Sequence, residues 1–332
     1  MTLYAGLGAS RGWKRSLVET EPVWQEHVFK GAQSVPIFGL VAVPDSPIGT
    51  VVGTYGITGD LEDQWFLRIM ARKAYAKGYA VVIFDWRAHG RTAKLSPTLT
   101  SDGLYEGEDF VRIAAGAKTL GCPAPFWFAG FSLGGLLAIW GVKAVQTLSK
   151  WGGDLGLSAS EIGGSAVICP ALESMRSLTY LTQAPLGKYL EKAIARKLKA
   201  LLLQLQQDHP GQFDPEAISR VRSIWSFDRE MVIPRLGFSS VEDYYRATSG
   251  LYLLPELTKP TLIIYAADDP LFDPSLVKDI QIACHQNPAV DLMMTAQGGH
   301  VGYVSSAVCQ QKFEDPDKWW AWNRVFDWLS RK

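Results

Sequence analysis

The sequence lacks the features that would assign a chain of this length to a specialised class. It has four cysteines, far apart and without a C-x-x-C spacing, which argues against a disulfide framework or a metal site and predicts reduced thiols. Its 33 basic and 33 acidic residues cancel, so no overall field favours nucleic acid or an anionic membrane. We find no repeat or low-complexity tract in the 332 residues. These absences leave a globular protein with no nucleic-acid partner.

Targeting and cofactor signals are also weak. Met1–Gly12 has no apolar core of a secretory leader. Gly6–Arg11 is rich in glycine but lacks the third glycine and the preceding strand of a dinucleotide site, so no cofactor is predicted. Residues 119–142 carry no charge, yet Pro123, Pro125 and a Gly-Gly pair indicate a buried strand and helix rather than a membrane span. We expect a soluble, cytoplasmic protein without a transmembrane segment.

What the sequence does contain is a regular alternation of short β-rich runs and amphipathic helices, with 47% hydrophobic residues. This alternation predicts an α/β fold with a mostly parallel, doubly wound sheet. The predicted strands are Val23–Phe29, Ile37–Val43, Thr50–Tyr55, Ala80–Asp85, Phe126–Phe131, Ala166–Cys169, Thr261–Ala266 and Val290–Thr295. The predicted helices include Glu62–Lys77, Glu106–Thr119, Ser275–Cys284 and one that starts at Asp317.

The strand rhythm stops between Ala171 and Leu257, where only helical patterns occur, among them Leu186–Gln207. An all-helical segment between two strands predicts a cap inserted over the carboxyl ends of the strands, where ligands bind in open α/β sheets. We therefore predict a core of residues 1–170 and 258–332 and a cap of residues 171–257. Leu186–Gln207 is amphipathic and basic, so it either packs one face on the core or touches lipid at a membrane surface.

The most informative motif is Gly130-Phe-Ser132-Leu-Gly134, which joins an apolar strand to an apolar helix. A serine at such a strand-to-helix turn is presented above the sheet edge, beside the free N–H groups of the helix start. A serine hydroxyl needs a base to take its proton and an acid to orient that base. The motif therefore predicts Ser132 as a nucleophile, provided that an acid and then a histidine follow in the chain.

Both partners are present in that order. His300 follows the last predicted strand in a glycine-rich loop, which places it at the same sheet edge. The strand Thr261–Ala266 is followed by Asp268 and Asp269, of which only one can face the imidazole. Asp269, directly before Pro270, is the preferred acid and Asp268 the second choice. The N–H groups of Leu133 and Ile57 are the predicted oxyanion donors, because they follow the nucleophile and the third strand.

These residues and their surroundings resemble the YheT-like branch of the α/β-hydrolase superfamily, which includes bacterial hydrolases, plant embryo-abundant esterase-like proteins and animal lipases. The resemblance runs from about Val51 to the C-terminus and is most specific over Trp225–Tyr245, with its Phe-Asp, Gly-Phe and Asp-Tyr-Tyr elements. It implies an α/β-hydrolase core and a Ser132, Asp269, His300 triad. Two departures are notable: the family's His-Gly at the oxyanion loop is Tyr55-Gly56 here, and the membrane-spanning helix of the animal lipases is missing.

The sequence thus predicts a serine hydrolase that cleaves a small-molecule or lipid carboxylic ester with an apolar acyl chain through an acyl-enzyme. Two alternatives stay open. The same triad serves acyl transfer and thioester hydrolysis equally well. A hydrolase fold can also be kept by a non-catalytic binding protein. Neither the physiological ester nor the oligomeric state is predicted.

Overall fold

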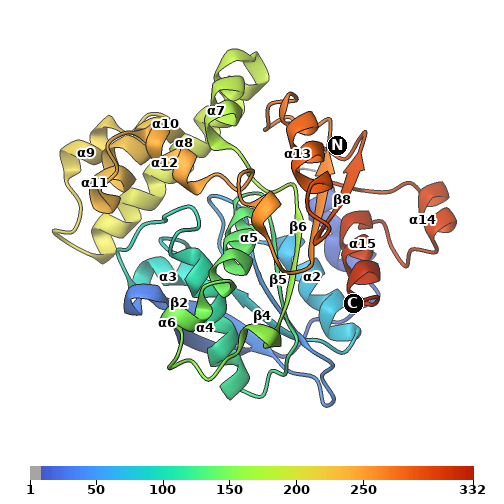
Figure 1. Cartoon of the computed structure of the whole chain (residues 1–332). Coiled ribbons are helices and arrows are strands. Elements are labelled where there is room, and N and C mark those ends of the chain that lie inside the picture. The colour runs from blue at the N-terminus through green and yellow to red at the C-terminus, as the bar shows by residue number, and fades with distance from the viewer. Residues whose placement is uncertain (1–8) are drawn as a thin grey trace.

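The computed structural model describes residues 9–332, which fold around one eight-stranded sheet in the order β1-β2-β4-β3-β5-β6-β7-β8 (Figure 1). β1 pairs antiparallel with β2 and β2 with β4, and all other neighbours are parallel. The strands are β1 Gln25–Lys30, β2 Pro36–Ala42, β3 Thr50–Thr54, β4 Ala80–Phe84, β5 Phe126–Phe131, β6 Ile162–Ile168, β7 Thr261–Ala266 and β8 Val290–Thr295. The predicted doubly wound α/β sheet is confirmed.

The central strand β5 shows how the sheet is covered on both faces. Successive side chains of a strand point to opposite faces. Phe128 contacts Phe110 of α4 (Glu106–Thr119) on one face. On the other face Trp127 contacts Trp328 of α15 (Trp320–Leu329), and Phe131 contacts Phe66 of α2 (Trp65–Ala76). Every residue of β5 is buried, which explains its uninterrupted apolar sequence.

Other helices of the core add to these layers. α5 (Leu133–Val145) packs against α4 and against β5 and β6, whereas α14 (Ala307–Phe313) has no buried residue and lies at the surface. Near the C-terminus the tryptophans Trp319, Trp322 and Trp328 are buried and belong to the main hydrophobic cluster. The helices of the core not yet given are η1 Ala9–Ser16, η2 Ala32–Ser34, α3 Gly90–Leu95, α6 Leu148–Trp151, η3 Ala159–Glu161 and α13 Leu276–His285.

A group of helices lies between β6 and β7 in the chain and sits to one side of the sheet (Figure 1). They are α7 Ser174–Gln183, α8 Pro185–Asp208, α9 Pro215–Arg220, α10 Ile224–Phe227, η4 Asp228–Val232, α11 Ile233–Leu236, α12 Val241–Thr248 and η5 Leu254–Glu256. Most of them share a hydrophobic cluster of their own, which also takes in Ala88, Ala93 and Leu99 from the core. This shared cluster fixes the helices to the loops above the sheet.

The division at residues 171 and 257 remains a prediction, and packing refines it. Leu251, Leu254 and Leu257 belong to the main cluster of the sheet rather than to the cluster of the cap helices. Helix α8 buries Leu198, Leu202 and Leu205 on the cap cluster, as its amphipathic pattern predicts. Its Leu186 and Tyr189 are exposed, and contact with lipid is still a prediction.

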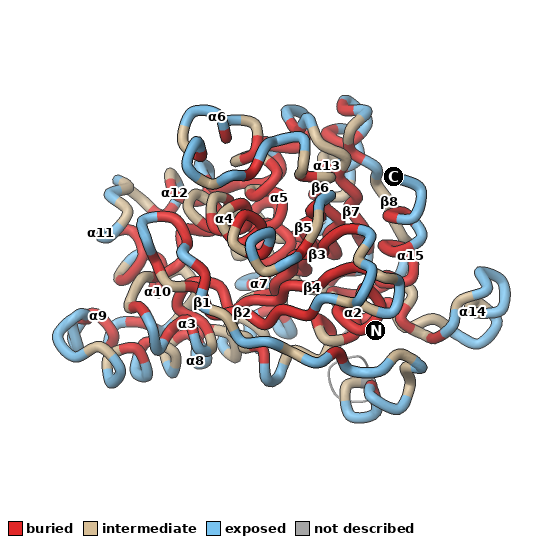
Figure 2. Tube along the Cα trace, turned by 90° about the horizontal axis from the view of Figure 1, so that it is seen from below, coloured by how far each residue is buried: buried red, intermediate tan, exposed pale blue. Residues whose placement is uncertain are grey.

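Burial follows the same pattern along the chain (Figure 2). Strands β2 to β7 and the inner faces of the flanking helices are buried, the edge strands β1 and β8 are partly exposed, and turns and the outer edge of the cap are exposed. Helix α5, whose apolar sequence resembles half of a membrane span, is buried against the sheet. Among the described residues, no helix is long and apolar enough to span a bilayer.

Some predicted boundaries are wrong. β6 begins at Ile162, not Ala166, because Gly163 and Gly164 hide its first half from a propensity-based reading. The register between β5 and β6 shifts at this point, and Gly164 has a positive φ of 145°. The short helix α3 is not predicted at all. Part of Met1–Gly12, for which no leader or dinucleotide site is predicted, lies outside the described residues.

Candidate active site

Ser132 lies at the sharp turn between β5 and α5. Its φ of 55° and ψ of −129° are rare for a residue with a side chain, and such backbone strain concentrates at functional sites. Hydrogen bonds hold the turn in place: the Ser132 N–H donates to the Ile168 carbonyl at 3.0 Å, and the Ser132 carbonyl accepts from the Ala171 N–H at 3.1 Å. The side chain is buried and lies at the edge of a cavity.

The two glycines of the motif are required by close backbone approach. A Cβ on Gly130 would overlap the carbonyl oxygen of Gly134, and a Cβ on Gly134 would overlap the carbonyl oxygen of Tyr55 at the end of β3. The start of α5 therefore packs directly on β5 and on the loop after β3. This packing brings the Gly56 loop next to the serine, where a Cβ on Gly56 would lie 2.8 Å from Ser132 Cβ.

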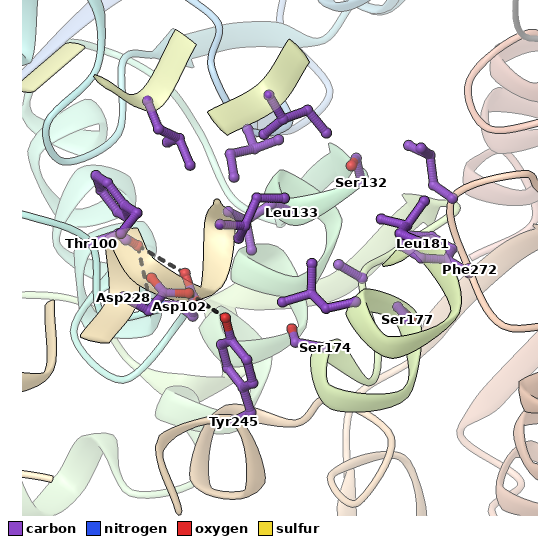
Figure 3. Close-up of a pocket in the computed structure, with 18 of the residues that line it drawn as sticks. Thr100, Asp102, Ser132, Leu133, Ser174, Ser177, Leu181, Asp228, Tyr245 and Phe272 are labelled. Atoms are coloured by element: carbon purple, nitrogen blue, oxygen red, sulfur yellow. Dashed lines mark hydrogen bonds between the residues drawn. The ribbon is translucent and has the colours of Figure 1, made fainter. Parts of the chain in front are cut away.

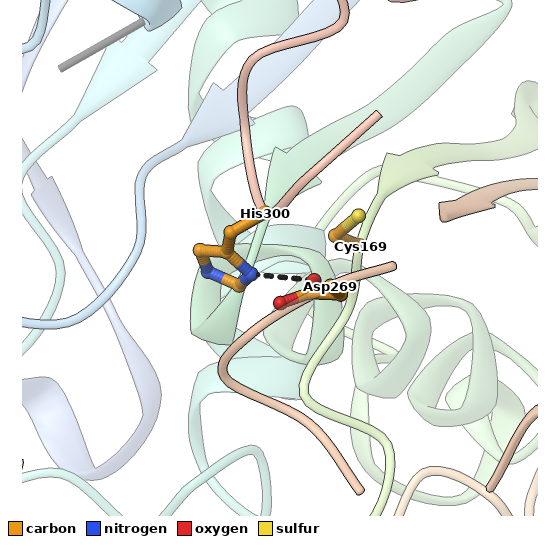
Figure 4. A group of neighbouring side chains, drawn as sticks. All are labelled: Cys169, Asp269 and His300. Carbon is orange, nitrogen blue, oxygen red and sulfur yellow. Dashed lines mark hydrogen bonds and ion pairs between the residues drawn. The ribbon is translucent and has the colours of Figure 1, made fainter. Parts of the chain in front are cut away.

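A continuous hydrogen-bonded chain joins the serine to a histidine and a carboxylate. His300 Nε2 lies 2.8 Å from Ser132 Oγ, and His300 Nδ1 lies 2.8 Å from Asp269 Oδ2. Figure 4 shows the imidazole and the Asp269 carboxylate facing each other across this contact. All three side chains are buried. Phe272 meets the imidazole edge-on at 5.0 Å between ring centroids, which restricts rotation of the ring.

Of the two adjacent carboxylates, Asp269 is the one that meets the imidazole. Its other oxygen, Oδ1, accepts from the Leu271 N–H at 2.9 Å, so the carboxylate is held from both sides. The second choice, Asp268, points elsewhere. Its Oδ1 accepts from the N–H groups of Gly298 and Gly299, both at 2.8 Å. Asp268 thus fixes the loop that carries His300 rather than the imidazole itself.

The predicted oxyanion donors lie at the same edge of the cavity. Leu133 is the first residue of α5, where N–H groups have no partner within the helix. Ile57 lies in the loop beside Ser132, and within residues 9–332 its N–H donates to no protein acceptor. The next N–H, that of Thr58, donates to His89 Nε2 at 3.2 Å. Burial lowers the pKa of His89 to about 4, so the ring is neutral and can accept this bond at Nε2.

Asp85, Arg87 and His89 follow β4 and form buried polar contacts near the site. Asp85 accepts from the Tyr55 hydroxyl at 2.5 Å and from the Leu61 N–H at 2.9 Å. Burial raises the pKa of Asp85 to about 6 against the opposing effect of these bonds. Tyr55, which stands where the family has histidine, therefore ties the Gly56 loop to the end of β4.

Ser132 opens onto a cavity of about 900 Å³, part of which is open to solvent. Its walls are mostly apolar and come from the core and from the cap; they include Ile57, Leu133, Leu178, Leu181, Ile194, Leu198, Phe227 and Phe272. Figure 3 shows Ser132 on one side of this cavity and a pair of carboxyls, Asp102 and Asp228, on another, with Leu133 between them in this view.

Cys169 lies beside the histidine and the acid (Figure 4). In the described part of the chain, Cys169, Asp269 and His300 are the one group of such side chains whose ligand atoms are close enough to hold a metal ion, within 4.8 Å of one another. Burial, and then the charge of Asp269, hold the pKa of the Cys169 thiol well above its usual range. A neutral thiol beside an already hydrogen-bonded His-Asp pair fits a proton-transfer site better than a metal site.

Sequence reasoning gave no role to several side chains around the serine. Cys169 and Tyr303, whose side chains meet at 3.3 Å, carry no motif that would mark them. Asp102 stands in a loop without any recognisable pattern. Asp228 belongs to the Phe-Asp pair that carries part of the family resemblance. That pair marked the residue as characteristic of the family but did not predict that its side chain lines the cavity.

Comparison with known proteins identifies the family of this fold. A family model described as "Alpha/beta hydrolase family" matches residues 51–309. The Synechocystis protein named "Putative esterase slr0264" is 53% identical over the whole chain and 91% of its own length. Escherichia coli YheT is 29% identical over 62% of this chain, and mouse phospholipase ABHD3 is 28% identical over 77%. This chain spans just over half of those two proteins, 55% and 58%.

Solved structures show the same fold. The esterase Pf2001 of Pyrococcus furiosus superposes with a TM-score of 0.55 over 93% of this chain and 92% of its own, at 20% sequence identity. The acylaminoacyl peptidase of Pyrococcus horikoshii also reaches 0.55, over 98% of this chain and 43% of its own, at 13% identity. The sheet, the family match and the Synechocystis relative agree, and the chain belongs to the α/β-hydrolase family.

Proposed function

We propose that this protein is a serine hydrolase that cleaves a carboxylic ester through an acyl-enzyme. The observation that carries the proposal is the unbroken hydrogen-bonded chain from Ser132 through His300 to Asp269. A hydroxyl in this setting can pass its proton to the imidazole as it attacks a carbonyl carbon. The names of relatives, an esterase in Synechocystis and a phospholipase in mouse, support ester chemistry.

In this mechanism each group has a defined role. Ser132 Oγ attacks the ester carbonyl while His300 Nε2 takes its proton. Asp269 accepts from His300 Nδ1–H, holds the ring in the tautomer whose Nε2 accepts the proton of Ser132, and stabilises the imidazolium that forms. The N–H groups of Leu133 and Ile57 donate to the oxyanion of the tetrahedral intermediate. His300 then protonates the leaving alcohol as the ester C–O bond breaks, which leaves the acyl group on Ser132. In the second half His300 takes a proton from a water molecule that attacks the acyl carbonyl, and returns it to Ser132 Oγ as the acid leaves.

The walls of the cavity support a substrate with an apolar part. Leu178, Leu181, Ile194 and Leu198 of α7 and α8 line it together with Phe272. Burying one methylene group against such walls is worth about 0.8 kcal/mol. An acyl chain of several carbons would therefore gain binding energy in steps as it lengthens, until the cavity is full.

The test is ester hydrolysis by purified protein with p-nitrophenyl butyrate. Ser132→Ala removes the nucleophile and should lower kcat by at least about 10³-fold. Ser174→Ala is the matched control, because Ser174 lines the same cavity but has no partner in the proposed chain; its kcat should stay within about threefold. Unchanged hydrolysis in Ser132→Ala would contradict the proposal.

A further inference from the structure

Two carboxyl groups face the substrate cavity away from Ser132. Asp102 comes from the loop before α4, and Asp228 comes from the first position of η4 in the cap. Both residues line the cavity, and both are more than nine-tenths buried, with 8% and 5% of their surface exposed. The Tyr245 hydroxyl donates to Asp228, and the Thr100 hydroxyl donates to Asp102 at 3.2 Å, as Figure 3 shows.

The pair has no positively charged partner. Two other buried acids have a cationic partner, Asp109 with Arg87 and Asp317 with Lys73, whereas Glu173, which also lines the cavity, forms no salt bridge in the described chain but caps the start of α7 through the Arg176 N–H. Within residues 9–332 no lysine, arginine or histidine forms a salt bridge with Asp102 or Asp228, and no lysine or arginine lines the cavity. A buried carboxyl without a counter-charge costs several kcal/mol or holds its proton. The cavity therefore has an acidic end that the chain itself does not neutralise.

A second observation points to a ligand at this end. The Tyr244 hydroxyl is fully buried and forms no well-aligned hydrogen bond in the described chain, although Asp102 lies near enough to accept a weak one. Burial, and then the charges of Asp102 and Asp228, hold the pKa of Tyr244 well above its usual range, because the hydroxyl lies against these two carboxyls. A buried hydroxyl without a well-formed hydrogen bond is rare in folded proteins and costs about 1–3 kcal/mol. It offers a lone pair beside the two carboxyls.

We propose that Asp102, Asp228, Tyr244 and Tyr245 form a subsite for a positively charged nitrogen, and that the substrate is an ester carrying an ammonium group. The carboxyls supply the counter-charge, and the Tyr244 oxygen supplies a hydrogen-bond acceptor. The aromatic ring of Tyr245, which also lines the cavity, can contribute a cation–π contact. That the bound ester is a substrate rests on the proposed function, whereas binding of the cation does not depend on it.

Protonation gives this subsite a signature of its own. Burial, and then the charge of Glu106, raise the pKa of Asp102 to about 7, and burial with the charge of Asp102 holds the pKa of Asp228 well above its usual range. The titratable groups that face the pair are Glu106, Tyr244 and Tyr245. Near neutral pH the pair holds at least one proton. A bound ammonium favours the ionised carboxylate, so binding should release a proton and tighten as the pH rises from 6 to 8.

The experiment is calorimetric titration of the full chain carrying Ser132→Ala with octylammonium and, for comparison, octan-1-ol. We expect octylammonium to bind at least about tenfold more tightly at pH 8. Its affinity should rise by up to about tenfold per pH unit below pH 7. Repeating the titration in buffers of different ionisation enthalpy should show proton release with octylammonium and none with the alcohol.

Variants then assign the effect. Asp102→Asn and Asp228→Asn keep the shape of the side chain, and together they should abolish the preference for octylammonium. Glu173→Gln is the matched control, because Glu173 is another buried carboxyl that lines the cavity. Its glutamine can still accept the Arg176 N–H bond that starts α7, so the preference should persist. If the Asn variants do not fold, the proposal is tested by whether the Ser132→Ala protein releases a proton when it binds octylammonium.

Equal affinity for octylammonium and octanol, or binding without proton release, would overturn the proposal. So would a loss in Glu173→Gln as large as in the Asn variants. A last arm compares hydrolysis by wild-type protein of p-nitrophenyl esters with and without a terminal ammonium on acyl chains of equal length; faster cleavage of the charged series is expected. Because binding is measured without the nucleophile, a failed cation site and a failed hydrolase remain distinguishable.

Discussion

Asp268 and Asp269 are adjacent carboxylates with different tasks, and replacing each by asparagine separates them. In Asp269→Asn the amide nitrogen can face His300 Nδ1, which moves the ring proton to Nε2. Nε2 then cannot accept the proton of Ser132, although every residue keeps its shape. In a serine protease triad the same change lowers kcat by about 10⁴-fold, which corresponds to about 5 kcal/mol of barrier at about 1.36 kcal/mol per decade.

Asp268→Asn should do far less. The side-chain oxygen that accepts from the Gly298 and Gly299 N–H groups at 2.8 Å is kept in asparagine. Only the charge of the acceptor is lost, worth about 1 kcal/mol of stability, and kcat should fall by less than about tenfold.

The assay is kcat with p-nitrophenyl butyrate for the two variants, with thermal unfolding measured in parallel. For Asp269→Asn we expect a severe loss of kcat at nearly unchanged stability. For Asp268→Asn we expect a small loss of stability and a kcat that falls by less than about tenfold. A larger loss of kcat in Asp268→Asn than in Asp269→Asn would refute the assignment of the acid.

Three further predictions concern the surroundings of the serine. Gly56→Ala places a Cβ 2.8 Å from Ser132 Cβ, so kcat with p-nitrophenyl butyrate should fall by about tenfold or more; unchanged kcat would mean that this loop does not pack on the serine. Burial lowers the pKa of His89 from 6.5 to about 4, so the stability that neutral His89 contributes is present above pH 6.5 and is lost, by about 3 kcal/mol, as the pH falls through 4. The free energy of urea unfolding of wild type, measured relative to His89→Gln, should therefore fall over that pH range. A constant difference between the two proteins would contradict this. Burial raises the pKa values of Cys122 and Cys284 to about 12 and holds that of Cys169 well above its usual range, whereas Cys309 is half-buried. Iodoacetamide at pH 8 should therefore modify Cys309 first, as peptide mass mapping can check, and early modification of Cys169 would count against a closed core.

The sequence predicted the parts of the fold that local patterns encode. The ranges of β5, β7 and β8 agree with the predicted strands, because each is an apolar run closed by a turn. The start of β6 was missed because Gly163 and Gly164 have low strand propensity. In the structure, pairing with β5 holds this segment in the sheet despite that low propensity. Helix α3 is too short for a periodic signal.

The site was predictable as far as chain order determines it. Ser132, Asp269 and His300 follow the order that the fold imposes, and each comes after a strand that ends at the same edge. Which of two neighbouring carboxylates meets the imidazole depends on loop geometry, and preference for the residue before Pro270 was the available argument. The pairing of Asp102 with Asp228 could not be predicted, because it depends on how the cap settles on the core.

The central claim is that Ser132 is a nucleophile activated by His300. The most direct measurement is the intact mass of the protein after a fluorophosphonate is added, with the modified peptide identified. The account predicts one adduct per chain, on Ser132, absent from Ser132→Ala and formed at least about 10³ times more slowly in His300→Ala. An adduct on another residue, or none in folded wild-type protein, would contradict it.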